Sequence, residues 1–267
     1  MPTSQRCLLG VFAHPDDETP CAAGTFARYA REGVAVYVVT ATRGEQGTLG
    51  TNGQRVTRHD LPRVRDAELR AVLRMYGAEP PIFLGYRDHD VQQVDRDELV
   101  ARITAIMHAI KPDVVLTFGP HGLSGHPDHL AVHQATVAAF HQYRQTTAAE
   151  PRLYYKALLP DAVEALGLTL EGPEVEPTLM IDISAYKALK VRALRTYKTQ
   201  EDAQRLADLF ERTPWAVEAF HQAYPPVPVG VQSVGFWETA RTSDPAVLMP
   251  HTRQDDAEME LEERQGQ

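Results

Sequence analysis

Two short stretches of the chain carry the side chains best suited to catalysis. Residues 13–18 read Ala-His-Pro-Asp-Asp-Glu, and residues 126–129 read His-Pro-Asp-His. A histidine three residues from an aspartate supplies two ligands for a borderline metal ion, and an adjacent carboxylate supplies a base for its water. Asp16 and Asp17 could instead only cap a helix, but capping needs one carboxylate and does not explain His14. We therefore predict a metal centre.

Both stretches stand in the same local context. Apolar runs at residues 7–12 and 113–119 precede them, and helix-compatible segments follow, from about Glu18 and from Pro127. Apolar runs of this length are typical of buried parallel strands. Open α/β sheets bind their ligands at the carboxyl ends of such strands. We expect both stretches at one edge of one sheet.

Four side chains are candidate ligands at that edge: His14, Asp17, His126 and His129. Three of them as ligands leave a fourth position for water, which is typical of catalytic rather than structural zinc. A remaining carboxylate would take the proton of that water. Spacing alone does not decide which histidines bind, because His129 and His133 would also suit a metal. A lone helical histidine is more often structural, and we assign His133 to that class.

Strand and helix patterns alternate along most of the chain. The first strand–helix–strand unit implies a right-handed crossover and a parallel pair, so the fold class is α/β with a mostly parallel sheet. Further strands are predicted at residues 34–40, 81–86, 153–159, 178–183 and 235–238. Further helices are predicted at residues 61–76, about 95–110, 187–198 and 202–212. We predict one domain over residues 1–250 and an acidic, disordered tail over residues 251–267.

Composition excludes several partners. The chain has 267 residues, 43% hydrophobic and 24% charged, as in an ordinary globular protein. Its net charge of -9 argues against nucleic acid as a partner. Neither a signal peptide nor an apolar run of about 20 residues is recognisable, so we expect a cytoplasmic protein without membrane attachment. The sequence leaves the oligomeric state open, a homo-oligomer included.

The two motifs together resemble a known family, the LmbE-like (PIG-L) zinc-dependent N-acetylglucosaminyl deacetylases. Weaker similarities occur at residues 42–45, 65–68, 85–88 and 190–200, so the resemblance covers residues 7 to about 200. It implies a Rossmann-like three-layer sandwich without a nucleotide, with the metal site at the carboxyl ends of the strands. Relatives often have histidine where this chain has Tyr197, and the sequence assigns the C-terminal half no role in the pocket.

The resemblance also implies a role for each site residue. Asp16 would be the general base, and His126, if protonated, would place positive charge beside the tetrahedral oxyanion or protonate that species. Asp128 would orient one of the histidines, and Arg65 and Glu45 would contact the substrate. The implied zinc ligands are His14, Asp17 and His129. Such a site could also accept iron or cobalt.

These inferences predict a zinc-dependent hydrolase acting on a small amino sugar. It would remove the N-acetyl group from a molecule containing N-acetylglucosamine, such as a glucosaminyl precursor of a thiol pathway, with Asp16 taking a proton from the metal-bound water. One alternative is an amidase of thiol-sugar conjugates with the same zinc chemistry. Another is a non-catalytic sugar- or metal-binding module, although a base beside three ligands counts against it.

Overall fold

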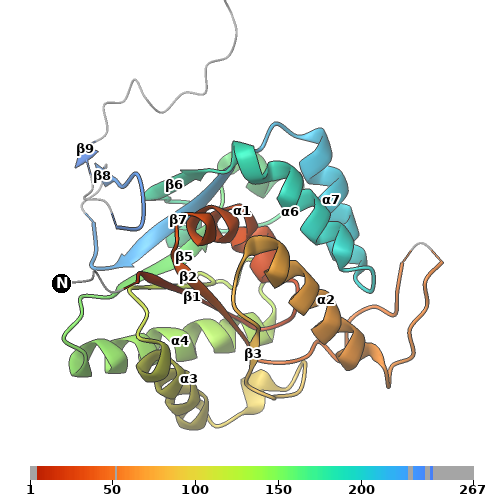
Figure 1. The fold of residues 1–267 in the computed structure, drawn as a ribbon, viewed down its shortest axis with the longest axis horizontal. Coiled ribbons are helices and arrows are strands. Elements are labelled where there is room, and N and C mark those ends of the chain that lie inside the picture. The colour runs from red at the N-terminus through yellow and green to blue at the C-terminus, as the bar shows by residue number, and fades with distance from the viewer. Residues whose placement is uncertain (1–4, 52, 228–230, 238–240, 243–267) are drawn as a thin grey trace, which may run out of the picture.

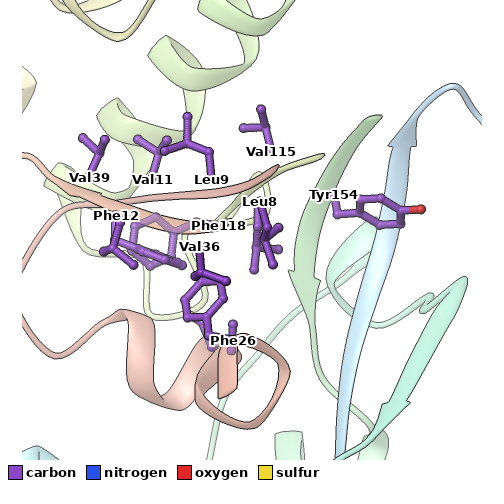
Figure 2. Close-up of a cluster of buried hydrophobic side chains, with 14 of the residues drawn as sticks. Leu8, Leu9, Val11, Phe12, Phe26, Val36, Val39, Val115, Phe118 and Tyr154 are labelled. Carbon is purple, nitrogen blue, oxygen red and sulfur yellow. The ribbon is translucent and has the colours of Figure 1, made fainter. Parts of the chain in front are cut away.

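The apolar run at the start of the chain forms β1 (Cys7–Phe12), and all six of its residues are buried. The computed structural model describes residues 5–51, 53–227, 231–237 and 241–242. Leu8 and Leu9 point to opposite faces of the sheet, and apolar side chains cover both (Figure 2). A strand buried on both faces needs no polar alternation, which explains the continuous apolar run.

One seven-stranded sheet contains β1, in the strand order β3-β2-β1-β4-β5-β7-β6. The first five strands in that order are parallel, whereas β7 is antiparallel to both β5 and β6. The strands besides β1 are β2 (Ala35–Thr40), β3 (Ile82–Phe83), β4 (Val114–Thr117), β5 (Arg152–Ala157), β6 (Leu179–Asp182) and β7 (Val217–Tyr224). A separate pair consists of β8 (Val231–Gln232) and β9 (Arg241–Thr242). The prediction of a mostly parallel α/β sheet is confirmed.

Helices cover both faces of the sheet and make three layers (Figure 1). One face carries α1 (Glu18–Arg31), α2 (Leu61–Tyr76), α6 (Lys187–Thr196) and α7 (Glu201–Arg212). The other carries α3 (Arg96–Ile110) and α4 (Pro127–Thr146). A short α5 (Pro160–Leu166) follows β5, and single 3-10 turns lie at Val91–Gln93, Gly172–Glu174 and Ser184–Tyr186. Among the described helices, none is long and apolar enough to cross a bilayer.

The structure differs from the sequence prediction in the C-terminal half. Strand β7 and helix α5 were not predicted. The strand predicted at residues 235–238 is wrong for residues 235–237, which form a bend, while Glu238 lies outside the described residues. The bend inserts the fully buried Phe236 beside Tyr154 and Phe220, so its apolar character serves core packing rather than a strand. The predicted tail at 251–267 also lies outside the described residues.

Candidate metal centre

The loops that follow β1, β2, β3 and β4 meet at one edge of the sheet, as parallel strands require. Backbone hydrogen bonds continue across these loops, since the N–H of Thr42 donates to the Ala13 carbonyl over 2.9 Å. The N–H of Tyr86 likewise donates to the Ala41 carbonyl over 3.0 Å. The loops therefore extend the sheet and hold their side chains on a rigid base.

Asp17 stands at the start of α1 but its carboxylate makes no capping hydrogen bond to that helix. It accepts instead from the backbone N–H of His14 over 2.7 Å. The preceding residue, Asp16, has a φ of 111°, which is unusual for a residue other than glycine. The interpretation of the two aspartates as helix caps therefore does not describe this turn.

Three donor groups converge beside this turn. The His14 Nδ1 and His129 Nε2 atoms are 3.2 Å apart. One oxygen of Asp17 lies 3.4 Å from the first nitrogen, and the other oxygen lies 3.3 Å from the second. Ligands at about 2.05 Å from a tetrahedral zinc ion are separated by about 3.3 Å. The spacing between the two histidine nitrogens matches that of two ligands on a zinc-sized ion, and a different oxygen of Asp17 faces each of them.

The opposite nitrogens of the two histidines have partners of their own. His14 Nε2 lies 3.0 Å from an Asp88 oxygen and 3.3 Å from an Asp128 oxygen. His129 Nδ1 lies 2.9 Å from the Gly122 carbonyl oxygen. Such partners fix the orientation of a ligating imidazole and raise its basicity. Asp128 thus occupies the orienting position expected of it, and Asp88 shares that position.

The charges in this cluster shift its pKa values strongly. Burial lowers the pKa of His14, but hydrogen bonds with Asp128, Asp17 and Asp88 outweigh it and raise that pKa well above the usual value. Burial opposes ionisation of Asp17, yet the charges and hydrogen bonds of His129 and His14 hold its pKa well below the usual range. The Asp17 carboxylate therefore remains ionised and can balance the charge of a cation.

His126 lies against both histidines without joining their donor set. Its ring centroid is 4.8 Å from that of His14 and 5.0 Å from that of His129. His126 could replace Asp17 as a ligand, since its ring offers a donor atom within 4.8 Å of the other two. However, its Nδ1 accepts the N–H of Asp128 over 3.1 Å. That contact favours the neutral ring with hydrogen on Nε2, which is a hydrogen-bond donor.

The pKa of His126 agrees with this neutral state. Burial, followed by the charges of His14 and His129, lowers the pKa of His126 below its ordinary value. A protonated imidazole could not accept at Nδ1. The structure therefore favours a neutral hydrogen-bond donor over the positive charge that the sequence suggested.

Asp16 is held by a buried arginine. Arg65 is only 3% exposed, and its Nη2 donates to an Asp16 oxygen over 2.9 Å. The same guanidinium donates to the carbonyls of Pro15 and Gly44. Burial raises the pKa of Asp16 to about 7, against the charge of Arg65 and with the help of the Asp17 charge. A carboxylate with such a pKa can both accept and return a proton near neutrality.

The two residues predicted to contact the substrate have structural contacts of their own. Arg65 lines the cavity described below, but its guanidinium is bound to Asp16 and to backbone carbonyls. Glu45 accepts the N–H of Asp88 over 3.1 Å, and Asp88 accepts the N–H of Gln46 over 2.8 Å. These reciprocal bonds join the loops after β2 and β3. In this structure Glu45 fixes the position of Asp88.

The donors and Asp16 line a cavity of about 400 Å³. Sequence reasoning missed two parts of it. Asp88 is 4% exposed and follows β3, so its position after the strand predicted at residues 81–86 and the similarity at residues 85–88 were the available signals. The C-terminal half also lines the cavity, through Gln200, Asp202, Ala203 and Leu206. Tyr197 lies behind this wall and donates to a Glu18 oxygen over 2.6 Å.

His133 stays outside the donor cluster. Its Nδ1 lies 2.8 Å from the Phe118 carbonyl oxygen, and its ring contacts Tyr155 with centroids 4.9 Å apart. The side chain is 8% exposed. Among the described residues, none of the groups that could hold a metal ion includes His133, which agrees with its assignment as a structural histidine.

Similarity to curated proteins extends over most of the chain. A deacetylase of Mycobacteroides abscessus that acts on 1D-myo-inositol 2-acetamido-2-deoxy-alpha-D-glucopyranoside is 33% identical over 233 residues. The match covers 74% of this chain and 82% of that protein.

Solved structures share the fold at lower identity. The N,N'-diacetylchitobiose deacetylase of Pyrococcus horikoshii superposes with a TM-score of 0.62 at 22% identity, covering 82% of this chain and 84% of that one. A 4-carboxy-2-hydroxymuconate hydratase of Pseudomonas putida superposes with a TM-score of 0.62 at 20% identity, covering 84% and 98%. The fold alone therefore does not identify the reaction.

The family model for GlcNAc-PI de-N-acetylase, PIG-L, matches residues 9–140. This segment contains both histidine motifs and the loops after β1 to β4. Together with the identity to the curated deacetylase, the match shows that this chain belongs to the PIG-L family.

Proposed function

We propose that this protein removes the N-acetyl group from a small molecule containing N-acetylglucosamine. The observation that supports this most is the position of Asp16, a carboxylate with a pKa of about 7, raised by burial, beside three convergent metal donors. Membership of the PIG-L family and the names of the relatives support an acetylated glucosamine as the source of the amide.

In this proposal His14, Asp17 and His129 hold one zinc ion. When bound, the ion supplies Lewis-acid chemistry, lowering the pKa of water and polarising a carbonyl oxygen. Asp88 and Asp128 orient His14 through its Nε2. Because both carboxylates are ionised, they also raise the basicity of the ligating nitrogen.

The protons move through two side chains. Asp16 accepts a proton as water attacks the amide carbon, while Arg65 keeps the carboxylate directed at the cavity. The Nε2–H of His126 donates to the amide oxygen as negative charge develops there. Asp16 then returns its proton to the sugar nitrogen, and the C–N bond breaks to give acetate and a free amine.

Amine release from N-acetylglucosamine-based substrates tests the proposal. The metal-free protein should be inactive, and one equivalent of zinc should restore turnover. Asp16→Asn should bind zinc normally but lose about 10²- to 10⁴-fold in kcat, the usual contribution of a general base. Metal content measured on the same samples separates loss of the base from loss of the ion.

Asp66→Asn is a matched control, because Asp66 lies on α2 outside the cavity. There it forms ion pairs with Arg43 and Arg70. Its turnover should stay within about twofold of the wild type. Unchanged turnover in Asp16→Asn would exclude Asp16 as the base. If zinc binds but no acetylated sugar is cleaved, an amidase with another acyl group or a binding module becomes the better description.

A further inference from the structure

We infer that Glu174, in the C-terminal half of the chain, holds the metal ligand His129 in position through the loop after β4. His129 is taken as a zinc ligand, so the inference rests on the proposed function. Glu174 is not among the residues that line the cavity, and it lies outside the segment 9–140 that matches the family model. It is therefore a positioning residue, which acts on the metal centre through other residues.

The Glu174 side chain is fully buried and binds the loop after β4 through both carboxylate oxygens. Its Oε1 accepts the backbone N–H of Leu123 over 2.9 Å. Its Oε2 accepts the backbone N–H of His121 over 3.0 Å and lies 2.7 Å from Nδ1 of the same residue. Hydrogen bonds to an ionised carboxylate are stronger than those between neutral groups. These contacts fix the loop on both sides of Gly122.

Gly122 carries the contact to the metal ligand. Its carbonyl oxygen lies 2.9 Å from His129 Nδ1, so that Nε2 of the same ring faces the other two donors. The backbone at this point is unusual, with φ of 63° at Gly122 and 60° at Leu123. A positive φ is unfavourable for a residue with a Cβ atom, and the hydrogen bond from the Leu123 N–H to Glu174 helps to offset that cost.

Glu174 is itself held in place from two sides. Its backbone carbonyl accepts the N–H of Leu158 over 2.8 Å, which joins the 3-10 turn Gly172–Glu174 to the segment after β5. On the other side, a Cβ atom added at Gly119 would lie 2.1 Å from the Glu174 Cγ. Gly119 has no positive φ, so its missing side chain serves to leave room for Glu174.

Glu174→Gln tests the inference, because the amide has nearly the shape of the carboxylate but only one oxygen. Its nitrogen would face a backbone N–H, so the hydrogen bonds on one side of Gly122 are lost. Loss of a group that orients a metal ligand typically lowers metal affinity 10- to 100-fold. The dissociation constant for zinc should therefore rise by about tenfold or more. It is measured by competition with a chromophoric chelator, starting from the metal-free protein.

A spectroscopic measurement reports on the ligand geometry directly. The visible absorption bands of the cobalt-loaded protein depend on how the ligands are arranged around the ion. In Glu174→Gln these bands should shift, because the His129 ring is no longer held by a fixed Gly122 carbonyl. Denaturant unfolding of the metal-free variant shows that the protein is folded under the conditions of both measurements.

Glu171→Gln is the matched control. The Glu171 side chain is 85% exposed, and its Oε1 lies 3.6 Å from the Nε2 of His121. The substitution removes a negative charge beside the same histidine but leaves the backbone contacts of Glu174 intact. Because exposed ion pairs contribute little, the dissociation constant for zinc should stay within about twofold of the wild type.

Gly119→Ala reaches the Glu174 carboxylate without changing its chemistry. The added methyl group should displace Glu174 and raise the dissociation constant for zinc, as Glu174→Gln does. This variant decides the question if Glu174→Gln does not fold.

Two results would overturn the inference. One is a zinc affinity and a cobalt spectrum equal to those of the wild type in folded Glu174→Gln, or in folded Gly119→Ala where the first variant does not fold. The other is an equal loss of affinity in Glu171→Gln, since the charge near His121 would then be responsible. The deacetylase proposal fails on a different result, namely that the zinc-loaded wild type cleaves no acetylated glucosamine.

Discussion

Adjacent aspartates serve different partners because of one unusual backbone angle. A φ of 111° at Asp16 directs its carboxylate to Arg65, while the Asp17 carboxylate faces the two histidines. Such a conformation costs on the order of 1–3 kcal/mol in a residue other than glycine. The hydrogen bonds of Arg65 to Asp16 and to the Pro15 carbonyl offset that cost. At the scale of single residues, Arg65 thus determines both the position and the charge of the base.

Removal of the arginine charge should change the pH dependence of the reaction. The charge of Arg65 lowers the pKa of Asp16, so Arg65→Met should raise it. Because Asp16 must be ionised to accept a proton, the acidic limb of kcat/KM should move to higher pH, by about one to three pH units. Arg65→Lys keeps the charge and should move the limb less. If the acidic limb of kcat/KM in Arg65→Met stays at the wild-type pH, the charge of Arg65 does not control the pKa of Asp16.

Among the loops, the one between β2 and α2 determines where Arg65 lies. Gly44 has a φ of 66°, and a Cβ atom there would lie 1.9 Å from the Arg65 Nη1. The loop therefore needs glycine twice over, for its backbone angle and for the space that the guanidinium occupies. Two further hydrogen bonds join this loop to the loop after β3. The N–H of Gln46 donates to Asp88, and the N–H of Asp88 donates to Glu45.

This loop offers a matched pair of substitutions. Gly44→Ala should displace Arg65 and reduce kcat on the order of 100-fold, as small displacements near a reacting group do. Gly53→Ala meets the same kind of backbone angle, φ 84°, but no atom within 4 Å. It should lose about 1 kcal/mol of stability and keep its turnover. Equal turnover in the two variants would show that the position of Arg65 does not matter.

Across the whole molecule, a buried ionic cluster joins α1 to strands and a helix of the C-terminal half of the chain. Glu218 on β7 accepts the N–H groups of Gly24 and Thr25 on α1 and lies 2.8 Å from the Lys190 ammonium of α6. Lys156 on β5 lies close by and donates to the Ala219 carbonyl over 3.2 Å. The cluster holds two cations and one carboxylate, so one positive charge is buried without an equal counter-charge.

Stability should therefore depend on pH through Lys156. Burial, together with the Lys190 charge, lowers the pKa of Lys156 from 10.5 to about 8. The unfolded chain thus binds this proton more tightly, which destabilises the fold below pH 8 by about 3 kcal/mol and ceases to do so above pH 10.5. Lys156→Met should remove that destabilisation.

Denaturant unfolding of the wild type and Lys156→Met across this pH range measures the effect. The advantage of the variant should be largest near pH 7 and fall by about 3 kcal/mol as the pH rises through 8 to 10.5. Lys198→Met, at an exposed lysine, is the control and should show no such trend. An advantage that does not vary with pH would mean that the pKa of Lys156 is the same in the folded and the unfolded chain.

The N-terminal half of the site could be predicted from the sequence, because each of its two motifs directly follows a recognisable strand. Apolar runs identify buried strands, and parallel strands bring their carboxyl ends together, so His14, Asp17, His126 and His129 could be grouped without a structure. Only the family resemblance selected three of them as ligands. The strand before Asp88 was predicted too, but a single aspartate after it gave no reason to place that residue beside His14. The leucines that line the cavity from α5 and α7 could not be predicted, because these helices reach the cavity only through long-range packing. Strand β7 was missed because it lacks the β-branched run that marks a strand.

The family model matches residues 9–140, a segment that contains every candidate ligand and Asp16. Several leucines that line the cavity come from residues 158–206, which lie entirely outside that segment. The candidate ligands and this part of the cavity lining are thus encoded in separate stretches of one gene. Mutations in the second stretch can alter which molecules are accepted while the reaction survives intact. A lineage with this layout can acquire new substrates gradually, without passing through an inactive ancestor.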